Sequence, residues 1–569
     1  MALSLQGSTP QSELAYTFFR NFFAGGNTIF FDFQPEASAM PCFLRHVSSA
    51  AIVVISVILS ALPAHGTEMP RLVKKDGRYA LMVDGQPFLI LGAQINNSSA
   101  WPAVLPEVWP AIEAIHANTV EVPVYWEQME PQPGRFDFSV VDELVKQARS
   151  HRVYLVLLWF GTWKNGRMHY VPEWIKTDPA QYPRMMNERG EPLDVLSPHA
   201  DSNLEADKKA FAALMQHLKQ IDGEQHTVLL VQVENESGSL GSVRDFSPAA
   251  EKLFQSQVPG DLVQALHRHP GNWKEVFGAD ADETFSAYAV AHYINQIAVA
   301  GKAEYPLPLY VNNWLKYRPE AIPGVNYPSG GPTYNMLDVW KAAAPAIDMI
   351  GPDIYIDDSR AYRETLSQYH RADNPTWVPE TGMEESFGKF FFYALGEGAI
   401  GFSPFGIDYT GWTITNEKPP AMHAENYALI APMDREIARL NFEGKLKTAV
   451  EEEGEAQTSL DFGKWQSTVA FGFPQYDGGP KAPGTKDHHG RALIAQLSPD
   501  EFLIAGIDAR IKFELAPKDN GRVQLLRAEE GRYENGSWKF IRLLNGDETD
   551  FGLNFTHQGK VVRIRLGTY

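Results

Sequence analysis

The sequence predicts a (β/α)8 barrel followed by an all-β, sandwich-like domain. From about residue 70 to residue 403, eight short apolar runs alternate with longer amphipathic stretches, which is the pattern of repeated βα units. Several runs end in acidic or amide residues, as strands do at the open end of a parallel barrel. After about residue 440 the runs are short and partly alternating, and no long helical period remains.

The predicted barrel domain covers residues 67–435, and its strands follow from the apolar runs. These runs are 88–94, 119–125, 153–159, 228–234, 308–312, 348–354, 376–380 and 399–403. Helices are expected between them, for example at 139–150 and 205–220. Periodicity alone cannot separate a short buried strand from a buried helix. The prediction therefore depends on the number and the order of the runs.

The predicted C-terminal domain covers residues 436–569 and is rich in β-structure. Candidate strands begin at Val523, Trp538 and Val561, and Asn535-Gly536 and Asn545-Gly546 are typical of hairpin turns. The acidic segment 451–455 is interpreted as a solvated linker or loop. We expect a sandwich that packs on the barrel.

The N-terminal region has the three parts of a secretory signal peptide. The apolar run 50–62 follows Arg45, and small residues come after it at Ala61, Ala64 and Gly66. The run is too short to span a bilayer, which takes roughly 20 residues. We therefore expect a signal at 40–66, an N-terminal extension of uncertain status at 1–39, and export to the periplasm or the medium without stable membrane insertion after the signal is removed.

Charge and cysteine content exclude several function classes. A formal net charge of −20 argues against nucleic-acid binding, which needs clustered Lys and Arg. The single cysteine, Cys42, lies in the predicted signal, so a mature chain would have neither a disulfide nor a cysteine-based metal site. A soluble enzyme that acts on a neutral ligand fits these observations.

Two carboxylates, Glu236 and Glu380, come at the ends of two predicted strands. Glu236 closes the run 231–236, and Glu380 closes the run 376–380. An unpaired charge inside a barrel costs several kcal/mol, so we expect both acids at the open strand ends. A retaining glycosidase uses two such acids, one as proton donor and one as nucleophile. Strand alternation predicts that Glu234 points the same way as Glu236, into the barrel near its mouth.

The sequence around these acids resembles the glycoside hydrolase family 35 β-galactosidases. Residues 231–238, Val-Gln-Val-Glu-Asn-Glu-Ser-Gly, are similar to the family's Q-V-E-N-E-Y-G signature, with Ser in place of Tyr. Residues 118–139 are similar to its N-T…W…E-P-x-P-G-x-(F/Y)-x-F-S stretch. The resemblance covers about residues 85–410. It implies that Glu236 is the acid/base, that Glu380 is the nucleophile and that Asn235 contacts substrate.

The chain also departs from the family pattern. Pro123 stands where many members have Tyr, Val-Pro-Glu-Thr replaces the usual S-E-F around Glu380, and the loop after the third strand lacks A-E-W. These differences indicate a divergent bacterial branch with a β-rich C-terminal domain.

Further substrate-binding candidates follow other strands. Three tryptophans come just after strands two, three and five, where we expect each ring either to stack on a sugar or to pack in the core. We expect Tyr355, after strand six, to hydrogen-bond the nucleophile. We expect the amides after strand one to bind sugar hydroxyls. The candidates are Trp126, Trp163, Trp314, Tyr355, Gln94, Asn96 and Asn97.

The sequence predicts no metal and no organic cofactor. Asp487-His488-His489 contains candidate metal ligands, but adjacent histidines in a Gly/Pro-rich loop are usually solvated. Residues 479–486 resemble a phosphate-binding loop only superficially, because the Lys-Thr order is reversed and two prolines replace amide donors.

The hypothesis from the sequence is an exo-acting, retaining β-galactosidase. It would release terminal non-reducing β-D-galactosyl residues, such as those of plant cell-wall xyloglucan side chains. One alternative is another exo-glycosidase of the same barrel clan, acting on β-glucosyl, glucosaminyl or arabinosyl groups. The other is a catalytically inactive carbohydrate-binding protein.

Overall fold

The computed structural model describes residues 68–472, 484–517 and 519–569. The chain divides into two units, Met1–Ala64 and His65–Tyr569, and all described residues belong to the second. The predicted signal peptide, the N-terminal extension and Cys42 lie outside the described residues.

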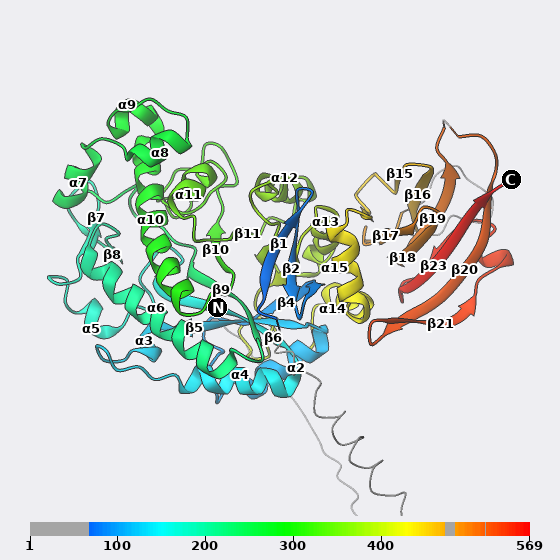
Figure 1. Ribbon diagram of the computed structural model, residues 1–569, viewed down its shortest axis with the longest axis horizontal. Helices are drawn as coiled ribbons and strands as arrows, with labels where there is room; N and C mark the ends of the chain where they lie inside the picture. The colour runs from blue at the N-terminus through cyan, green and yellow to red at the C-terminus, as the bar shows by residue number, and fades with distance from the viewer. Residues whose placement is uncertain (1–67, 473–483, 518) are drawn as a thin grey trace, which may run out of the picture. The chain divides into compact units, whose positions relative to one another are not determined.

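Eight parallel strands close into a barrel, as predicted (Figure 1). Around the barrel they follow the chain order, which confirms the predicted fold class. They are β4 (Ile90–Gln94), β5 (Thr119–Tyr125), β6 (Tyr154–Lys164), β9 (Val228–Asn235), β10 (Leu309–Trp314), β11 (Met349–Ile354), β12 (Val378–Thr381) and β13 (Gly401–Pro404). Almost every residue in these strands is buried, because barrel strands pack against the interior on one face and against helices on the other.

Helices connect the strands and cover the barrel. In α6, Leu204, Phe211 and Leu218 recur every seven residues and are buried, so this helix presents one apolar face to the barrel. The helices are α2 (Leu105–Ile115), α3 (Trp126–Met129), α4 (Ser139–His151), α5 (Glu173–Lys176), α6 (Asp201–Asp222), α7 (Pro248–Phe254), α8 (Gly260–Ala265), α9 (Trp273–Phe277), α10 (Ala281–Glu304), α11 (Leu337–Ala343), α12 (Ser359–Tyr369), α13 (Phe390–Gly396), α14 (Ala421–Ile430) and α15 (Asp434–Phe442), with 3₁₀ turns η1 (Gly278–Asp280), η2 (Glu385–Phe387), η3 (Ala431–Met433) and η4 (Gly546–Glu548).

The chain also forms two small antiparallel sheets, one before the first barrel strand and one between the barrel strands β6 and β9. The first consists of β1 (Arg71–Lys75), β2 (Arg78–Val83) and β3 (Gln86–Phe88), and the second of β7 (Arg184–Met186) and β8 (Pro192–Leu196). Leu81 and Phe88 of the first sheet belong to the same apolar core as the barrel.

The C-terminal region forms two antiparallel sheets (brown to red in Figure 1). The six-stranded sheet has the order β14-β17-β18-β23-β20-β21 and the four-stranded sheet the order β15-β16-β19-β22. Side chains from both sheets share one apolar core, which makes the pair a sandwich. The strands are β14 (Leu446–Val450), β15 (Gln457–Phe462), β16 (Trp465–Phe471), β17 (Arg491–Ser498), β18 (Glu501–Ile507), β19 (Ala509–Leu515), β20 (Val523–Glu534), β21 (Ser537–Leu543), β22 (Leu553–Phe555) and β23 (Lys560–Thr568).

The two predicted hairpin turns have different outcomes. Asn535 (φ 50°) and Gly536 (φ 71°) join β20 to β21 as a two-residue turn with both residues left-handed. The prediction at Asn545-Gly546 is wrong, because the Asn545 side chain accepts a hydrogen bond from the Gly546 N–H and the chain enters η4. From there it crosses to the other sheet as β22.

The sandwich packs on the barrel through the second face of its six-stranded sheet. Leu493, Ala495 and Leu503 of this sheet belong to the barrel's apolar core. Arg491 is fully buried at the same contact, where it donates to Glu425 Oε2 (2.9 Å) and to Asn426 Oδ1 (2.5 Å) of α14.

The acidic segment 451–455 is only in part the solvated linker or loop that the sequence indicated, because Glu453 and Glu455 are exposed whereas Glu451 and Glu452 are not. Glu451 is buried and accepts hydrogen bonds from Thr485 and from the Gly490 N–H. Glu452 accepts a hydrogen bond from the Tyr393 hydroxyl of α13. These acids therefore stabilise the contact between loops and the barrel, which a run of like charges in the sequence does not reveal.

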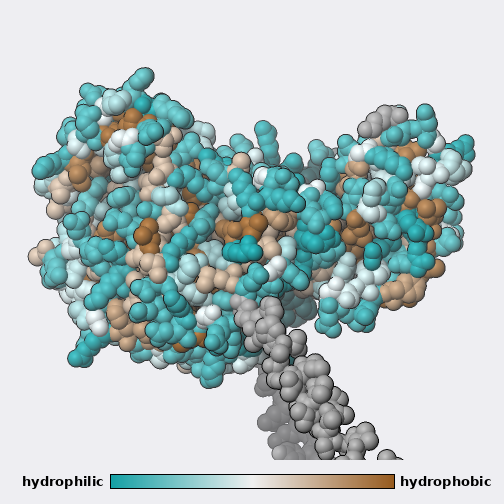
Figure 2. Space-filling model, in the orientation of Figure 1, coloured by the Kyte–Doolittle hydropathy of each residue, from teal (hydrophilic) through white to brown (hydrophobic). Residues whose placement is uncertain are grey.

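The surface in Figure 2 is mainly hydrophilic, and its hydrophobic residues form small separate groups. Among the described residues, no helix has both the length and the apolar character that a membrane span requires.

Candidate active site

Three carboxylates meet where the barrel strands β9, β11 and β12 end. One carboxylate oxygen each from Glu236, Asp353 and Glu380 lies within 4.8 Å of the other two. All three residues are buried. Asp353 and Glu380 are direct neighbours in the parallel register of β11 and β12. The structure thus brings the two predicted acids together, well within the roughly 9.5 Å that separates the acids of any such catalytic pair at most.

Glu380 is held by two hydrogen-bond donors. The amide of Gln94 donates to its Oε2 at 2.8 Å, and the hydroxyl of Tyr355 donates to its Oε1 at 2.6 Å. Hydrogen bonds to both oxygens fix the orientation of this carboxylate. Two of the predicted substrate contacts, Gln94 and Tyr355, therefore hold the nucleophile candidate.

Glu236 lies in a setting that favours its protonated form. Burial raises the pKa of Glu236 to about 8, the negative charge of Glu380 adds to this rise, and the cation of Lys164 partly opposes it. Glu236 has a left-handed backbone (φ 45°), and its N–H donates to Asn312 Oδ1 at 2.8 Å. Such a carboxyl can give a proton at neutral pH, as the acid of a catalytic pair must.

Asp353 is a third acid that the sequence prediction missed. It accepts a hydrogen bond from Asn312 Nδ2 at 2.8 Å, and burial raises its pKa well above the usual value, with further increases from Glu380 and Glu236. The signal was present in the sequence, because Asp353 also ends an apolar run, 348–354. Asn312 and Lys164 were missed as well, since neither stands out before the strands are assembled.

The Lys164 cation lies near this cluster, where it lowers the pKa of both Glu236 and Asp353 and so opposes the rise that burial causes.

The predicted orientation of Glu234 is wrong. It points away from Glu236, and its Oε2 accepts a hydrogen bond from the backbone N–H of Trp163 at 2.7 Å. Beside it lies Asp207 of α6, and burial raises the pKa of both acids, so the pair is suited to share a proton. The strand alternation fails because Glu234 has a left-handed backbone, with φ 67°.

Asn235 lies in the wall of the site. Its Oδ1 accepts from Asn312 Nδ2 at 3.1 Å and from Gln232 Nε2 at 3.0 Å, and the residue is fully buried. Asn97 follows strand β4 and is partly buried. Its amide oxygen is buried and has no hydrogen-bond partner within the described part of the chain.

Two of the three tryptophans are packing residues. Trp126 is fully buried, and its ring N–H donates to Glu130 Oε2 at 2.9 Å. Trp163 is also fully buried and packs edge-on against Tyr293. Neither ring is exposed to a sugar, because Trp126 packs against Trp159 and Trp163 packs against α10. The expectation that they bind substrate is therefore corrected.

Trp314, in contrast, lines a pocket of about 310 Å³. Tyr317 lines the same pocket, and its hydroxyl donates to the carbonyl of Asp353 at 3.2 Å. The same hydroxyl accepts from the Tyr355 N–H at 2.8 Å. Tyr317 therefore connects this pocket to the backbone of Asp353 and is a binding candidate that the sequence prediction missed.

Comparison with known proteins finds similarity to glycosidases. Residues 80–304 match the model of "Glycosyl hydrolases family 35", and residues 423–556 match a "Domain of unknown function (DUF5597)". Beta-galactosidase 17 of Arabidopsis thaliana is 24% identical over 227 residues, which are 37% of this chain and 29% of the plant protein. Beta-galactosidase of Xanthomonas manihotis is 26% identical over 201 residues, 34% of this chain and 31% of that protein. The chain thus spans less than a third of the length of these relatives.

Solved structures of similar fold include two β-galactosidases. The enzyme from Bacillus circulans sp. alkalophilus has a TM-score of 0.45 and 14% identity, covering 61% of this chain and 57% of its own. The enzyme from Rahnella sp. R3 has a TM-score of 0.45 and 16% identity, covering 62% and 58%. The family match confirms the resemblance predicted from the sequence, because residues 80–304, which include Glu236, match the model of glycosyl hydrolases family 35.

Proposed function

We propose that the protein is a retaining β-galactosidase that removes terminal galactosyl residues. The observation that carries this proposal is the pair Glu236 and Glu380, whose oxygens lie within 4.8 Å in opposite environments. One carboxyl has a pKa raised to about 8, and the other is held by two donors. Double displacement requires one acid that can donate a proton and a second carboxylate that is held in position for attack.

In the proposed reaction Glu380 attacks the anomeric carbon while Glu236 protonates the glycosidic oxygen. The bond to the leaving group breaks as the glycosyl–enzyme bond forms. Glu236, now ionised, takes a proton from water, and that water releases galactose with its original configuration. Asp353 is placed to share the proton of Glu236, and Lys164 is placed to stabilise Glu236 when it is ionised.

The finer parts of the proposal concern the substrate and the location. The names of the relatives support galactose as the sugar released. The pocket lined by Trp314 and Tyr317 supports an extended leaving group, such as a xyloglucan side chain. Export to the periplasm or the medium is supported by the apolar run 50–62 alone, and N-terminal sequencing of exported protein should begin after about residue 60.

Substitution of each acid tests the proposed roles. Glu380→Ala should lower turnover of a 4-nitrophenyl β-galactoside by several orders of magnitude, and added azide should restore part of it as an α-galactosyl azide. Glu236→Ala should lose less activity on this good leaving group, and azide should give the β-azide. Glu364→Ala, on the exposed face of α12, is the matched control and should keep full activity.

A panel of nitrophenyl glycosides separates this proposal from the alternatives. Fastest turnover of the β-galactoside supports it. Faster turnover of a β-glucoside, glucosaminide or arabinoside would assign another exo-glycosidase, and binding of all sugars without product would indicate an inactive binding protein. Near-normal activity of Glu380→Ala would refute the assigned nucleophile.

A further inference from the structure

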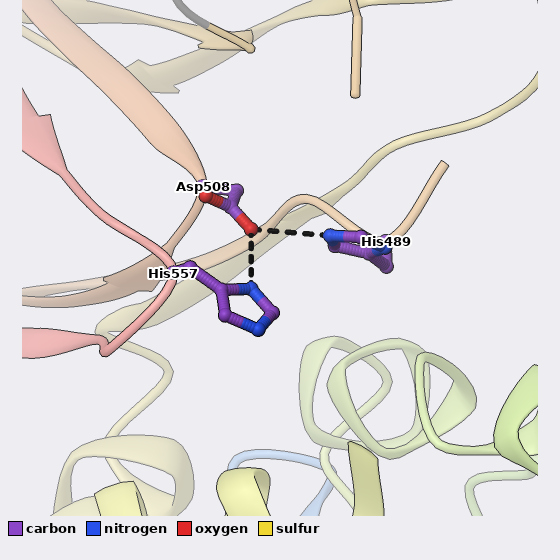
Figure 3. A group of neighbouring side chains, drawn as sticks. All are labelled: His489, Asp508 and His557. Carbon is purple, nitrogen blue, oxygen red and sulfur yellow. Dashed lines mark hydrogen bonds and ion pairs between the residues drawn. The ribbon is translucent and has the colours of Figure 1, made fainter. Parts of the chain in front are cut away.

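A second cluster of polar side chains lies outside the active site, in the C-terminal sandwich. His489, Asp508 and His557 are separated by many residues in the sequence, yet their side chains converge (Figure 3). His489 Nε2 lies 3.1 Å from Asp508 Oδ2, and His557 Nδ1 lies 3.0 Å from the same oxygen. The two imidazoles thus approach one carboxylate oxygen from two sides.

Each residue of this cluster comes from a different connection between strands. His489 precedes β17, Asp508 lies between β18 and β19, and His557 follows β22. The Asp508 N–H donates to the carbonyl of Thr556 at 3.3 Å, which ties the turn of Asp508 to the residue before His557. The His489 N–H donates to Thr485 Oγ1 at 3.0 Å. Backbone hydrogen bonds therefore hold all three side chains in place.

We propose that His489, Asp508 and His557 bind a Zn²⁺ ion. Ligands at 2.0–2.1 Å around a tetrahedral ion are about 3.3 Å apart, and the two nitrogen–oxygen separations of 3.1 and 3.0 Å are close to this. The three ligand atoms all lie within 4.8 Å of one another. Two imidazole nitrogens and one carboxylate oxygen form a donor set that suits zinc.

The surroundings of His557 also fit a metal ligand. Its second ring nitrogen, Nε2, faces Glu425 Oε1 of α14 at 3.8 Å. A ligating histidine commonly directs its other nitrogen to a carboxylate, which orients the ring. The side chain of His557 is 67% exposed, compared with 13% for Asp508, so a fourth position is open to water.

The charges near the cluster permit a divalent cation. Asp508 and Glu425 supply two negative charges. Arg491 supplies one positive charge, and its guanidinium already donates hydrogen bonds to Glu425 and Asn426. The rings of His489 and His557 lie 5.6 Å apart at 58°, so both can reach one ion without stacking.

The proposed ion would have a structural role. β18 and β23 belong to the six-stranded sheet, and β19 and β22 belong to the four-stranded sheet. An ion at this cluster would therefore link the two sheets at one end. Through Glu425 it would also stabilise the neighbouring contact with α14. The sequence alone did not reveal this site, because it showed only the adjacent pair His488-His489.

Zinc titration of the full-length, tag-free protein tests this proposal. After chelator treatment, isothermal titration with zinc sulfate should show one saturable site per chain, and zinc should raise the melting temperature. Cobalt in place of zinc should give the visible absorption bands of a tetrahedral site. His557→Ala and Asp508→Asn should each weaken zinc binding at least tenfold.

Two control variants make the result specific. His269→Ala removes an exposed histidine elsewhere and should leave zinc binding unchanged. Glu380→Gln disrupts the other carboxylate cluster and should also leave it unchanged. Wild-type protein with no saturable zinc site, or equal affinity in His557→Ala, would overturn the proposal. Because His557 is largely exposed, its variant remains informative even if Asp508→Asn fails to fold.

Discussion

The hydrogen bond from Tyr355 to Glu380 gives a quantitative prediction. The hydroxyl donates to Glu380 Oε1 at 2.6 Å, so Tyr355→Phe removes one of two donors to the proposed nucleophile. A hydrogen bond to a charged group contributes about 1.5–3 kcal/mol. Since about 1.4 kcal/mol corresponds to tenfold in rate, kcat/KM should fall roughly 10- to 150-fold. Gln94 still holds the other oxygen, so the loss should be smaller than that of Glu380→Ala.

The assay is the kcat/KM for a nitrophenyl β-galactoside, measured together with the melting temperature. Tyr355 is 44% exposed, so the substitution should leave stability nearly unchanged. Tyr79→Phe is the matched control, because its hydroxyl donates to a neutral backbone carbonyl, that of Ala372, at 2.9 Å. It should change kcat/KM less than twofold. A loss below about threefold in Tyr355→Phe would show that this hydrogen bond does not orient the nucleophile.

Three further predictions follow from the structure. Because Glu236 acts in its protonated form and its pKa is about 8, kcat/KM should fall above about pH 8. Lys164→Met removes the cation that lowers this pKa, so the fall in the pH profile of kcat/KM should move to higher pH. An unchanged pH profile would contradict the assignment. Trp314→Ala should raise KM for extended substrates. Trp126 is buried, so Trp126→Phe should lower the melting temperature and leave KM within about twofold. A large change of KM in Trp126→Phe would show that its ring reaches substrate. Arg491→Met removes a buried hydrogen-bonded cation whose partner Glu425 is 34% exposed, so it should lower the free energy of unfolding by about 1.5–3 kcal/mol. Exposed Arg527→Met should change it by less than about 1 kcal/mol in urea titrations.

The barrel was readable from the sequence because each of its strands is a local signal. All eight predicted runs correspond to barrel strands, with boundaries that differ by a few residues. Burial on both faces requires continuous apolar segments, and the chain order of a βα barrel is also its spatial order. The predicted domain boundaries at residues 67, 435 and 436 stay predictions.

The site residues that the sequence missed depend on contacts between distant strands. Asn312 became part of the site because it binds the Glu236 N–H and the carboxylate of Asp353. Trp126 and Trp163 failed as stacking candidates because position after a strand does not determine exposure. Glu234 failed because a left-handed residue interrupts the alternation of the strand.

The sequence by itself determined the fold class, the strand order and the two acids at strand ends, since these follow from local hydrophobic patterns and one family signature. Only the tertiary structure decided the electrostatic roles of those acids. A pKa depends on burial and on neighbouring charges, and Asp353 and Lys164 come close to Glu236 only when the barrel closes. The His489, Asp508 and His557 cluster likewise exists only after three strand connections meet.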